Sequence, residues 1–144
     1  MKIVFEAPKE GEEDTIIVRC RNINPEIIHL LDRVRAQDTL IGYINHEIHR
    51  LNPSEIYYIE TVDRKAFLYS KNAVYESKQK LYELEEILQA WNFMRAGKSL
   101  IINVAMVKSV TPMFSKNLEV VFVNNERVIV SRQYASALKK HLSM

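Results

Sequence analysis

The segment Leu118–Leu142 reads LEVVFVNNERVIVSRQYASALKKHL and decides how the rest of the chain is interpreted. Leu118–Val123 is apolar and rich in β-branched residues, which predicts a strand. Asn124–Asn125 predicts a two-residue turn, because asparagine tolerates positive φ, and Arg127–Val130 then forms the returning strand. After Ser131 the apolar residues recur at helical spacing. The segment therefore predicts a hairpin that leads directly into a helix.

The joint between the predicted hairpin and helix carries the polar residues Arg132 and Gln133. The hydroxyl of Ser131 is expected to cap the helix by accepting a hydrogen bond from a backbone N–H of the first turn. A long cation at such a joint has a fixed base and a free tip. From the pattern alone, however, Arg132 is better interpreted as an ordinary solvated side chain.

Three segments of the chain carry recognisable motifs: Ser54–Glu60, Phe93–Asn103, and Val130–Tyr134 followed by Leu138–Lys139. Together they resemble the LytTR DNA-binding domain of bacterial transcription regulators. Val130–Tyr134 with Leu138–Lys139 is similar to the closing signature of that family, Ser54–Glu60 resembles its opening strand, and Phe93–Asn103 resembles its central F-x-R-x-x-K/R-S-x-x-V/I-N segment. The three segments stand in the family's order, and the likeness covers about residues 41–142.

The resemblance implies a sequence-specific regulator that binds double-stranded DNA and inserts loops of a β scaffold into successive major grooves, usually at repeated sites. Carried over to this sequence, the DNA-binding residues are Arg64, Lys65, Lys98, Ser99, Arg132 and Gln133. Lys98 and Arg132 are the candidates for reading bases, because both side chains can donate to the O6 and N7 acceptors of guanine. Ser99 and Gln133 are candidates for bonds to phosphate or sugar.

The composition bounds the class of protein. The chain has 144 residues, enough for one domain with a core and an appendage. There is no signal-peptide pattern and no apolar run near the roughly 20 residues that span a bilayer, so we expect a cytoplasmic protein without membrane contact. Cys20 is the only cysteine, which fits a reducing compartment. Residues 41–144 carry 14 basic and 10 acidic side chains, a net charge of +4, which permits nucleic-acid binding.

Residues 1–40 are interpreted as a strand–strand–helix segment ahead of a DNA-binding domain at residues 41–144. Lys2–Phe5 and Thr15–Arg21 predict two strands joined by an acidic loop. Asn24–Ala36 predicts a capped helix with proline at its first position. The segment is too short for the receiver domain that many family members carry. We therefore expect a stand-alone regulator in which this segment mediates self-association as a homodimer or contacts a regulatory partner protein.

The segments between the family motifs predict short strands and one further helix. Ile56–Glu60 and Ala66–Ser70 predict a hairpin whose tip carries the two predicted loop cations. Lys80–Gln89 predicts a helix with an acidic outer face, which suits a scaffold role. Lys108–Phe114 predicts a strand in which Pro112 indicates an edge position. The expected fold class is α+β, mainly β with short helices.

Two enzyme-like or metal-binding patterns are rejected. His46 and His49 would point to opposite faces if Ile41–Leu51 is one strand, and no cysteine stands near them, so no zinc site is expected. Gly97–Ser99 matches the end of a phosphate-binding P-loop, but Asn92 stands where the first glycine is required. We expect no catalysis, no metal and no cofactor.

Two alternatives to DNA binding remain open. A protein-interaction module would use the same β surface to bind a peptide, without catalysis. An RNA-binding domain would carry aromatic stacking platforms, whereas the residues expected at the surface here are cationic. The affinity for duplex DNA, measured against salt concentration, separates these functions, because DNA binding weakens steeply as salt rises.

Overall fold

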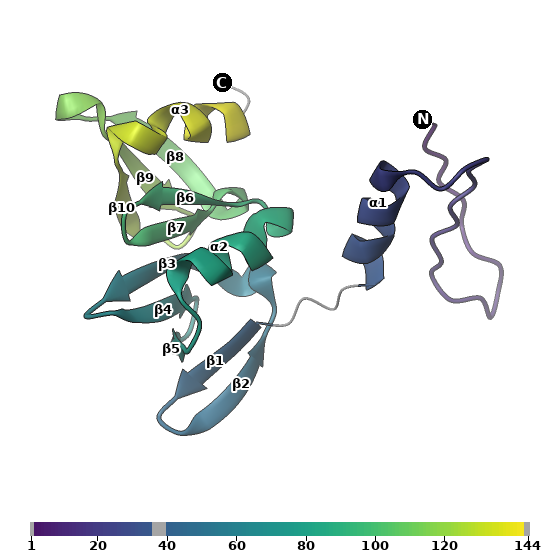
Figure 1. Cartoon of the computed structure of the whole chain (residues 1–144), viewed down its shortest axis with the longest axis horizontal. Coiled ribbons are helices and arrows are strands. Elements are labelled where there is room, and N and C mark those ends of the chain that lie inside the picture. The colour runs from purple at the N-terminus through teal and green to yellow at the C-terminus, as the bar shows by residue number, and fades with distance from the viewer. Residues whose placement is uncertain (1, 36–39, 143–144) are drawn as a thin grey trace. The chain divides into compact units, whose positions relative to one another are not determined.

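The computed structural model describes residues 2–35 and 40–142, and the chain divides into two units, Met1–Ala36 and Gln37–Met144 (Figure 1). The predicted end of the first helix, near Ala36, lies outside the described residues. No helix within the described ranges has the length and apolar character needed to cross a membrane.

The N-terminal unit contains helix α1, Pro25–Arg35. The Asn24 Oδ1 atom accepts a hydrogen bond from the backbone N–H of Ile27 at 2.9 Å, which confirms the predicted start of the helix. The predicted strands at Lys2–Phe5 and Thr15–Arg21 are wrong, because the described residues ahead of α1 form no strand. A β-branched sequence favours extended backbone, but a strand also needs a neighbour for its hydrogen bonds.

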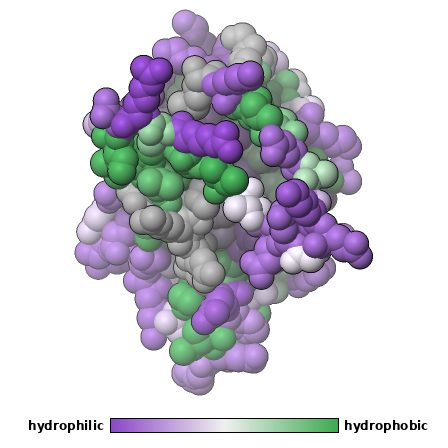
Figure 2. Space-filling model, turned by 90° about the vertical axis from the view of Figure 1, so that its right-hand side faces the viewer, coloured by the Kyte–Doolittle hydropathy of each residue, from purple (hydrophilic) through white to green (hydrophobic). Residues whose placement is uncertain are grey.

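Large apolar side chains of the N-terminal unit remain at the surface, and Figure 2 shows hydrophobic residues exposed beside hydrophilic ones. Phe5 is 95% exposed and Ile17 is 71% exposed, whereas Ile27 on α1 is only 8% exposed. Single exposed apolar side chains are ordinary, but a group of them within a short segment indicates an interaction surface.

The C-terminal unit is built from two antiparallel sheets. Within residues 40–142 the larger sheet has seven strands in the order β2-β1-β5-β4-β3-β7-β6, and the smaller has three in the order β10-β9-β8. The strands of the larger sheet are β1 Leu40–Ile44, β2 Glu47–Leu51, β3 Ile56–Val62, β4 Lys65–Ser70, β5 Val74–Ser77, β6 Phe93–Gly97 and β7 Leu100–Asn103. The strands of the smaller sheet are β8 Val107–Pro112, β9 Leu118–Phe122 and β10 Arg127–Val130.

Two α-helices complete the C-terminal unit, α2 at Leu81–Leu88 and α3 at Arg132–His141. Short 3-10 turns stand at Pro53–Glu55, Gln89–Trp91, Val104–Met106 and Phe114–Lys116. The prediction of a mainly β fold with short helices is confirmed.

The two hydrophobic cores of this unit lie on opposite faces of β7. Alternation along a strand sends neighbouring side chains to opposite faces, so Ile101 enters one core and Ile102 enters the other, and both are fully buried. The first core also contains the apolar face of α2. The second contains β9 residues such as Phe122 and the α3 residue Leu138. β7 is therefore held from both sides.

The region Ile41–Leu51, predicted as one strand, is a hairpin of β1 and β2. Its turn residue Asn45 has φ 56°, a conformation that asparagine adopts more readily than most residues. The sequence does not reveal this turn, because neither glycine nor proline marks it. His46 therefore lies in the turn, and the ring of His49 on β2 lies 5.2 Å from the ring of Tyr75.

The other predicted strands and helices of this unit are confirmed. β3 and β4 form the expected hairpin, and β9, β10 and α3 form the expected hairpin and helix. The expected two-residue turn at Asn124–Asn125 is wrong, because four residues, 123–126, connect β9 to β10. The residues Leu81, Leu84 and Leu88 form the buried face of α2. Pro112 lies at the end of β8, an edge strand of the smaller sheet, where a missing backbone N–H disrupts no ladder.

Candidate nucleic-acid interface

The hairpin β3–β4 ends in the two-residue turn Asp63–Arg64, in which φ is 50° and 67°. Two consecutive residues with positive φ make the tight turn whose twist matches that of paired strands. Val62 and Lys65 form the last pair of the ladder. Arg64 therefore stands at the tip and Lys65 directly behind it, and both are exposed.

The hairpin β6–β7 ends in a second two-residue turn, Lys98–Ser99, and both residues are exposed. Gly97 and Leu100 form the last pair of this ladder. The Ser99 carbonyl accepts a hydrogen bond from the backbone N–H of Thr61 at 2.9 Å. Because Thr61 lies near the end of β3, this bond ties the second tip to the first hairpin.

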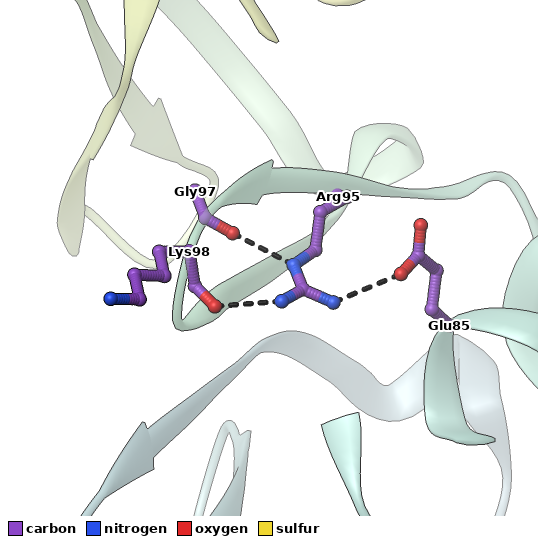
Figure 3. A network of polar contacts seen from close by, with 4 residues as sticks. All are labelled: Glu85, Arg95, Gly97 and Lys98. Carbon is purple, nitrogen blue, oxygen red and sulfur yellow. Dashed lines mark hydrogen bonds and ion pairs between the residues drawn. The ribbon is translucent and has the colours of Figure 1, made fainter. Parts of the chain in front are cut away.

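The side chain of Arg95 holds the β6–β7 turn in place (Figure 3). Alternation along β6 puts Arg95 on the same face as Phe93, which packs with α2. The Arg95 Nε donates to the Gly97 carbonyl at 2.8 Å, and Nη2 donates to the Lys98 carbonyl at 2.7 Å. The third nitrogen, Nη1, is 2.9 Å from Oε2 of Glu85 on α2. The Lys98 side chain points away from this network in Figure 3.

The joint between β10 and α3 is attached to β6. The Ser131 N–H donates to the Ala96 carbonyl at 3.1 Å, and the Arg132 N–H donates to Asn117 Oδ1 at 3.0 Å. The predicted cap by the Ser131 hydroxyl is wrong. Ser131 occupies the N-cap position, but its side chain makes no capping bond, and Asn117 from the loop ahead of β9 supplies a side-chain acceptor instead.

Two backbone hydrogen bonds thus connect the three places that carry the predicted DNA-binding residues. The Thr61–Ser99 bond joins the β3–β4 tip to the β6–β7 tip, and the Ser131–Ala96 bond joins β6 to the start of α3. In Figure 1 both hairpin tips and the start of α3 lie along one side of the C-terminal unit. We call this side the tip edge, defined by Asp63–Lys65, Lys98–Ser99 and Arg132–Gln133.

The cationic side chains of the tip edge make few interactions with the residues that the structure describes. The side chains of Arg64, Lys98 and Arg132 make no hydrogen bond or ion pair with any residue that the structure describes. Lys65 Nζ lies 3.9 Å from Glu76 Oε1, and its side chain is 62% exposed, so this contact is weak. Ser99 and Gln133 are also exposed. The edge presents positive charge without strong internal compensation.

Sequence reasoning missed two residues that shape the tip edge, Arg95 and Asn117. Arg95 bonds the carbonyls of Gly97 and Lys98, and Asn117 bonds the backbone N–H of Arg132. Arg95 did carry a signal, because it stands in the central motif directly ahead of the turn. Among the described residues, no three His, Cys, Asp or Glu side chains are placed to hold a metal ion.

The family model of the LytTr DNA-binding domain matches residues 46–143 of the chain, which is more than half of its length. The chain belongs to the LytTR family. This confirms the resemblance seen in the three sequence motifs. Membership of a family of DNA-binding regulators also confirms the prediction that the chain is not an enzyme.

A solved structure supports the LytTR fold. The chain is similar to the LytTr DNA-binding domain of a Bacillus cereus protein, with a TM-score of 0.71 and 27% sequence identity. The match covers 76% of this chain and 100% of that domain.

Two relatives differ in how much of their length is matched. The sensory transduction protein LytT of Enterococcus faecalis is 28% identical over 97 residues, which are 67% of this chain and 40% of that protein. The chain thus spans less than half the length of that relative. An uncharacterized HTH-type transcriptional regulator of Staphylococcus aureus is 26% identical over 147 aligned residues, which cover 100% of this chain and 99% of the relative.

Proposed function

We propose that this LytTR protein is a transcriptional regulator that binds double-stranded DNA sequence-specifically and contacts major grooves through its tip edge. The observation that carries the proposal is the pair of backbone hydrogen bonds that brings Arg64, Lys98 and Arg132 to one side of the unit. These three cations have no charged partner among the described residues. Cations without internal partners are free to replace the counterions of DNA.

The chemistry of each side chain suggests its role at the tip edge. Lys98 and Arg132 rise from rigid backbone and are long enough to reach the O6 and N7 atoms of guanine. Ser99 and Gln133 stand directly beside them and suit bonds to phosphate or sugar. Arg64 and Lys65 extend the positive surface along the duplex. Hairpin tips that enter successive major grooves would suit operators that contain repeated sites.

The first test is binding of the full chain to duplex DNA as a function of salt concentration. The logarithm of the binding constant should fall linearly with the logarithm of salt, with a slope of about −0.9 for each phosphate contacted. An interaction module that binds only peptides would show no affinity for duplex DNA at low salt. That outcome would remove the basis of the proposal.

The second test concerns Arg132 and uses a cognate site selected from a random pool of duplexes. Arg132→Ala should cost about 1–3 kcal/mol of binding free energy on the cognate site and little on random DNA, because a base contact distinguishes sequences. Arg127→Ala is the matched control, since Arg127 is exposed, lies on β10 just ahead of the joint that carries Arg132, and is paired with Glu119 at 2.8 Å. An equal loss on both DNAs would make Arg132 a phosphate contact. No loss on either DNA would contradict its role.

A further inference from the structure

The N-terminal unit has an apolar surface that its own described residues do not cover. Six large apolar side chains are each more than 60% exposed, namely Ile3, Val4, Phe5, Ile16, Ile17 and Ile23. On α1, Ile28 is 48% exposed and Leu30 is 40% exposed. A segment of this size with so much exposed apolar area indicates an interface.

The segment Thr15–Arg21 has the composition of a strand but no strand beside it. Its residues Thr15, Ile17 and Arg19 line an open cavity of about 460 Å³, together with residues such as Val4 and Glu6. Among the described residues ahead of α1, the backbone hydrogen bond that forms is the local one from the Glu12 N–H to the Lys9 carbonyl. The N–H and C=O groups of Thr15–Arg21 are therefore available for a ladder with another chain.

The charges around Thr15–Arg21 indicate which chain could pair with it. Acidic residues precede its apolar run at Glu12–Asp14, and basic residues follow it at Arg19 and Arg21. An antiparallel copy of the same segment places the acidic end of each copy beside the basic end of the other. A partner with charge of one sign would match only one end. The segment is thus complementary to itself, as a two-fold symmetric interface requires.

We propose that the segment Glu13–Arg21 pairs antiparallel with the same segment of a second copy of this chain. A two-fold axis normal to the ribbon passes at Ile17, so that Ile17 stands opposite Ile17. In this register Ile16 stands opposite Val18, and Glu13 stands opposite Arg21 at both ends. Opposite charges directly across a ladder stabilise it, and like charges destabilise it.

The same register gives the ribbon one apolar face. Side chains alternate along a strand, so Ile16, Val18 and Cys20 of both copies share a face, with Asp14 at its two ends. The charged pairs share the other face with Ile17. A two-stranded ribbon is only marginally stable in water unless something covers its apolar face. The exposed apolar residues of α1 in each copy could cover that face.

The first test exchanges the paired charges and measures association of the full chain by sedimentation equilibrium. The wild-type chain should be a dimer. Glu13→Lys and Arg21→Glu should each weaken the dimer about tenfold, because each places like charges opposite one another at both ends. The double variant Glu13→Lys/Arg21→Glu should recover wild-type association. Glu10→Lys, an equal change of charge outside the paired segment, is the control and should leave association unchanged.

The second test reads the register by cross-linking in a Cys20→Ser background. Ile17→Cys should form an intermolecular disulfide, because Cα atoms directly opposite one another lie within the roughly 7 Å that a disulfide allows. Thr15→Cys is the matched control, since the two copies of residue 15 would be separated by four residues, about 14 Å along the strand.

Three outcomes would overturn the inference. They are a wild-type chain that remains monomeric, a double charge variant that associates no better than the single variants, and cross-linking of Thr15→Cys as fast as Ile17→Cys. None of these results bears on DNA binding by the tip edge, which has its own tests.

Discussion

Arg95 is a cation that bonds backbone carbonyls of its own protein. The turn that it holds carries Lys98, whose side chain makes no such bonds with the described residues. The Arg95 guanidinium group bonds two carbonyls of the β6–β7 turn and one carboxylate of α2. A planar fork with several fixed donors can serve three acceptors at once, and a lysine ammonium at the same place cannot match that geometry. The turn that carries Lys98 is therefore fixed by a side chain that does not belong to the tip edge.

Arg95→Ala should lower the free energy of unfolding by about 1–2 kcal/mol, because two turn carbonyls lose a charged donor at a partly exposed site. It should also weaken cognate DNA binding and speed amide hydrogen exchange at Lys98 and Ser99. Glu85→Gln keeps both carbonyl bonds and is the comparison that isolates the ion pair. If Glu85→Gln speeds exchange at the turn as much as Arg95→Ala does, the carbonyl bonds do not hold the turn.

Among the elements, the β3–β4 turn combines a strained backbone with exposed side chains. Asp63 and Arg64 both have positive φ, a conformation that costs a non-glycine residue about 1–2 kcal/mol. Aspartate tolerates it comparatively well, whereas arginine has no such tendency. Strained backbone of this kind is concentrated at binding sites, so the turn is consistent with the proposed role of Arg64.

Arg64→Gly should therefore raise the free energy of unfolding by up to about 1 kcal/mol, since relief of strain exceeds the entropy that glycine adds to the unfolded chain. The same change should weaken DNA binding and reduce the salt slope by about 1. Arg64→Ala removes the same charge but keeps the positive φ, so it should weaken binding without a gain in stability. Chemical denaturation and salt titrations of both variants make the comparison. Equal stability of the two variants would argue against strain at this tip.

The elements that could be predicted are those in which the sequence contains both the pattern and the partner. Leu118–Val130 holds two complementary strands and the turn between them, so its hairpin follows from local sequence. Thr15–Arg21 holds a strand pattern alone, and its prediction failed because a ladder also depends on what lies beside it. The hairpin turn at Asn45 escaped because it depends on the left-handed tolerance of one asparagine, and neither glycine nor proline stands at the turn itself.

The sequence predicted where the candidate residues lie in the fold. It did not predict the hydrogen bonds that hold them there. The motifs placed Lys98 and Arg132 at a turn and at a strand–helix joint, and both positions are found there. The hydrogen bonds that hold these places join residues far apart in the chain, such as Thr61 with Ser99 and Arg132 with Asn117. Sequence spacing carries no information on such approaches, so the Ser131 hydroxyl was assigned a capping role that it does not have.

At the scale of the whole C-terminal unit, an aromatic column links the two sheets. The ring of Tyr58 on β3 stacks on Tyr69 of β4 at 4.3 Å and on Phe122 of β9 at 5.5 Å. Burial raises the pKa of the Tyr58 phenol well above its ordinary value, and the nearby carboxylate of Glu126 raises it further. Burial raises the pKa of Tyr69 as well.

These shifts predict a loss of stability in alkali. An unfolded tyrosine ionises near pH 10, whereas folded Tyr58 keeps its proton to higher pH. Above about pH 10 the unfolded state therefore binds fewer protons than the folded state, and the free energy of unfolding falls as pH rises. Tyr58→Phe should flatten this fall in denaturation series at increasing pH, and Tyr82→Phe, at a 62% exposed position, should not. Identical pH profiles for the two variants would exclude Tyr58 as the cause.

The burial of Ile101 in one core and Ile102 in the other has a consequence for spacing along a duplex. A slip of β7 by one residue would push each isoleucine into the opposite compartment, and both compartments are fully packed. Intermediate offsets are no better, because hydrogen-bonded ladders shift only in whole steps. The distances from Lys98 to the other two parts of the tip edge are thus fixed. If the proposed function holds, we expect this protein to accommodate operators of altered spacing by bending of the DNA and not by sliding of its strands.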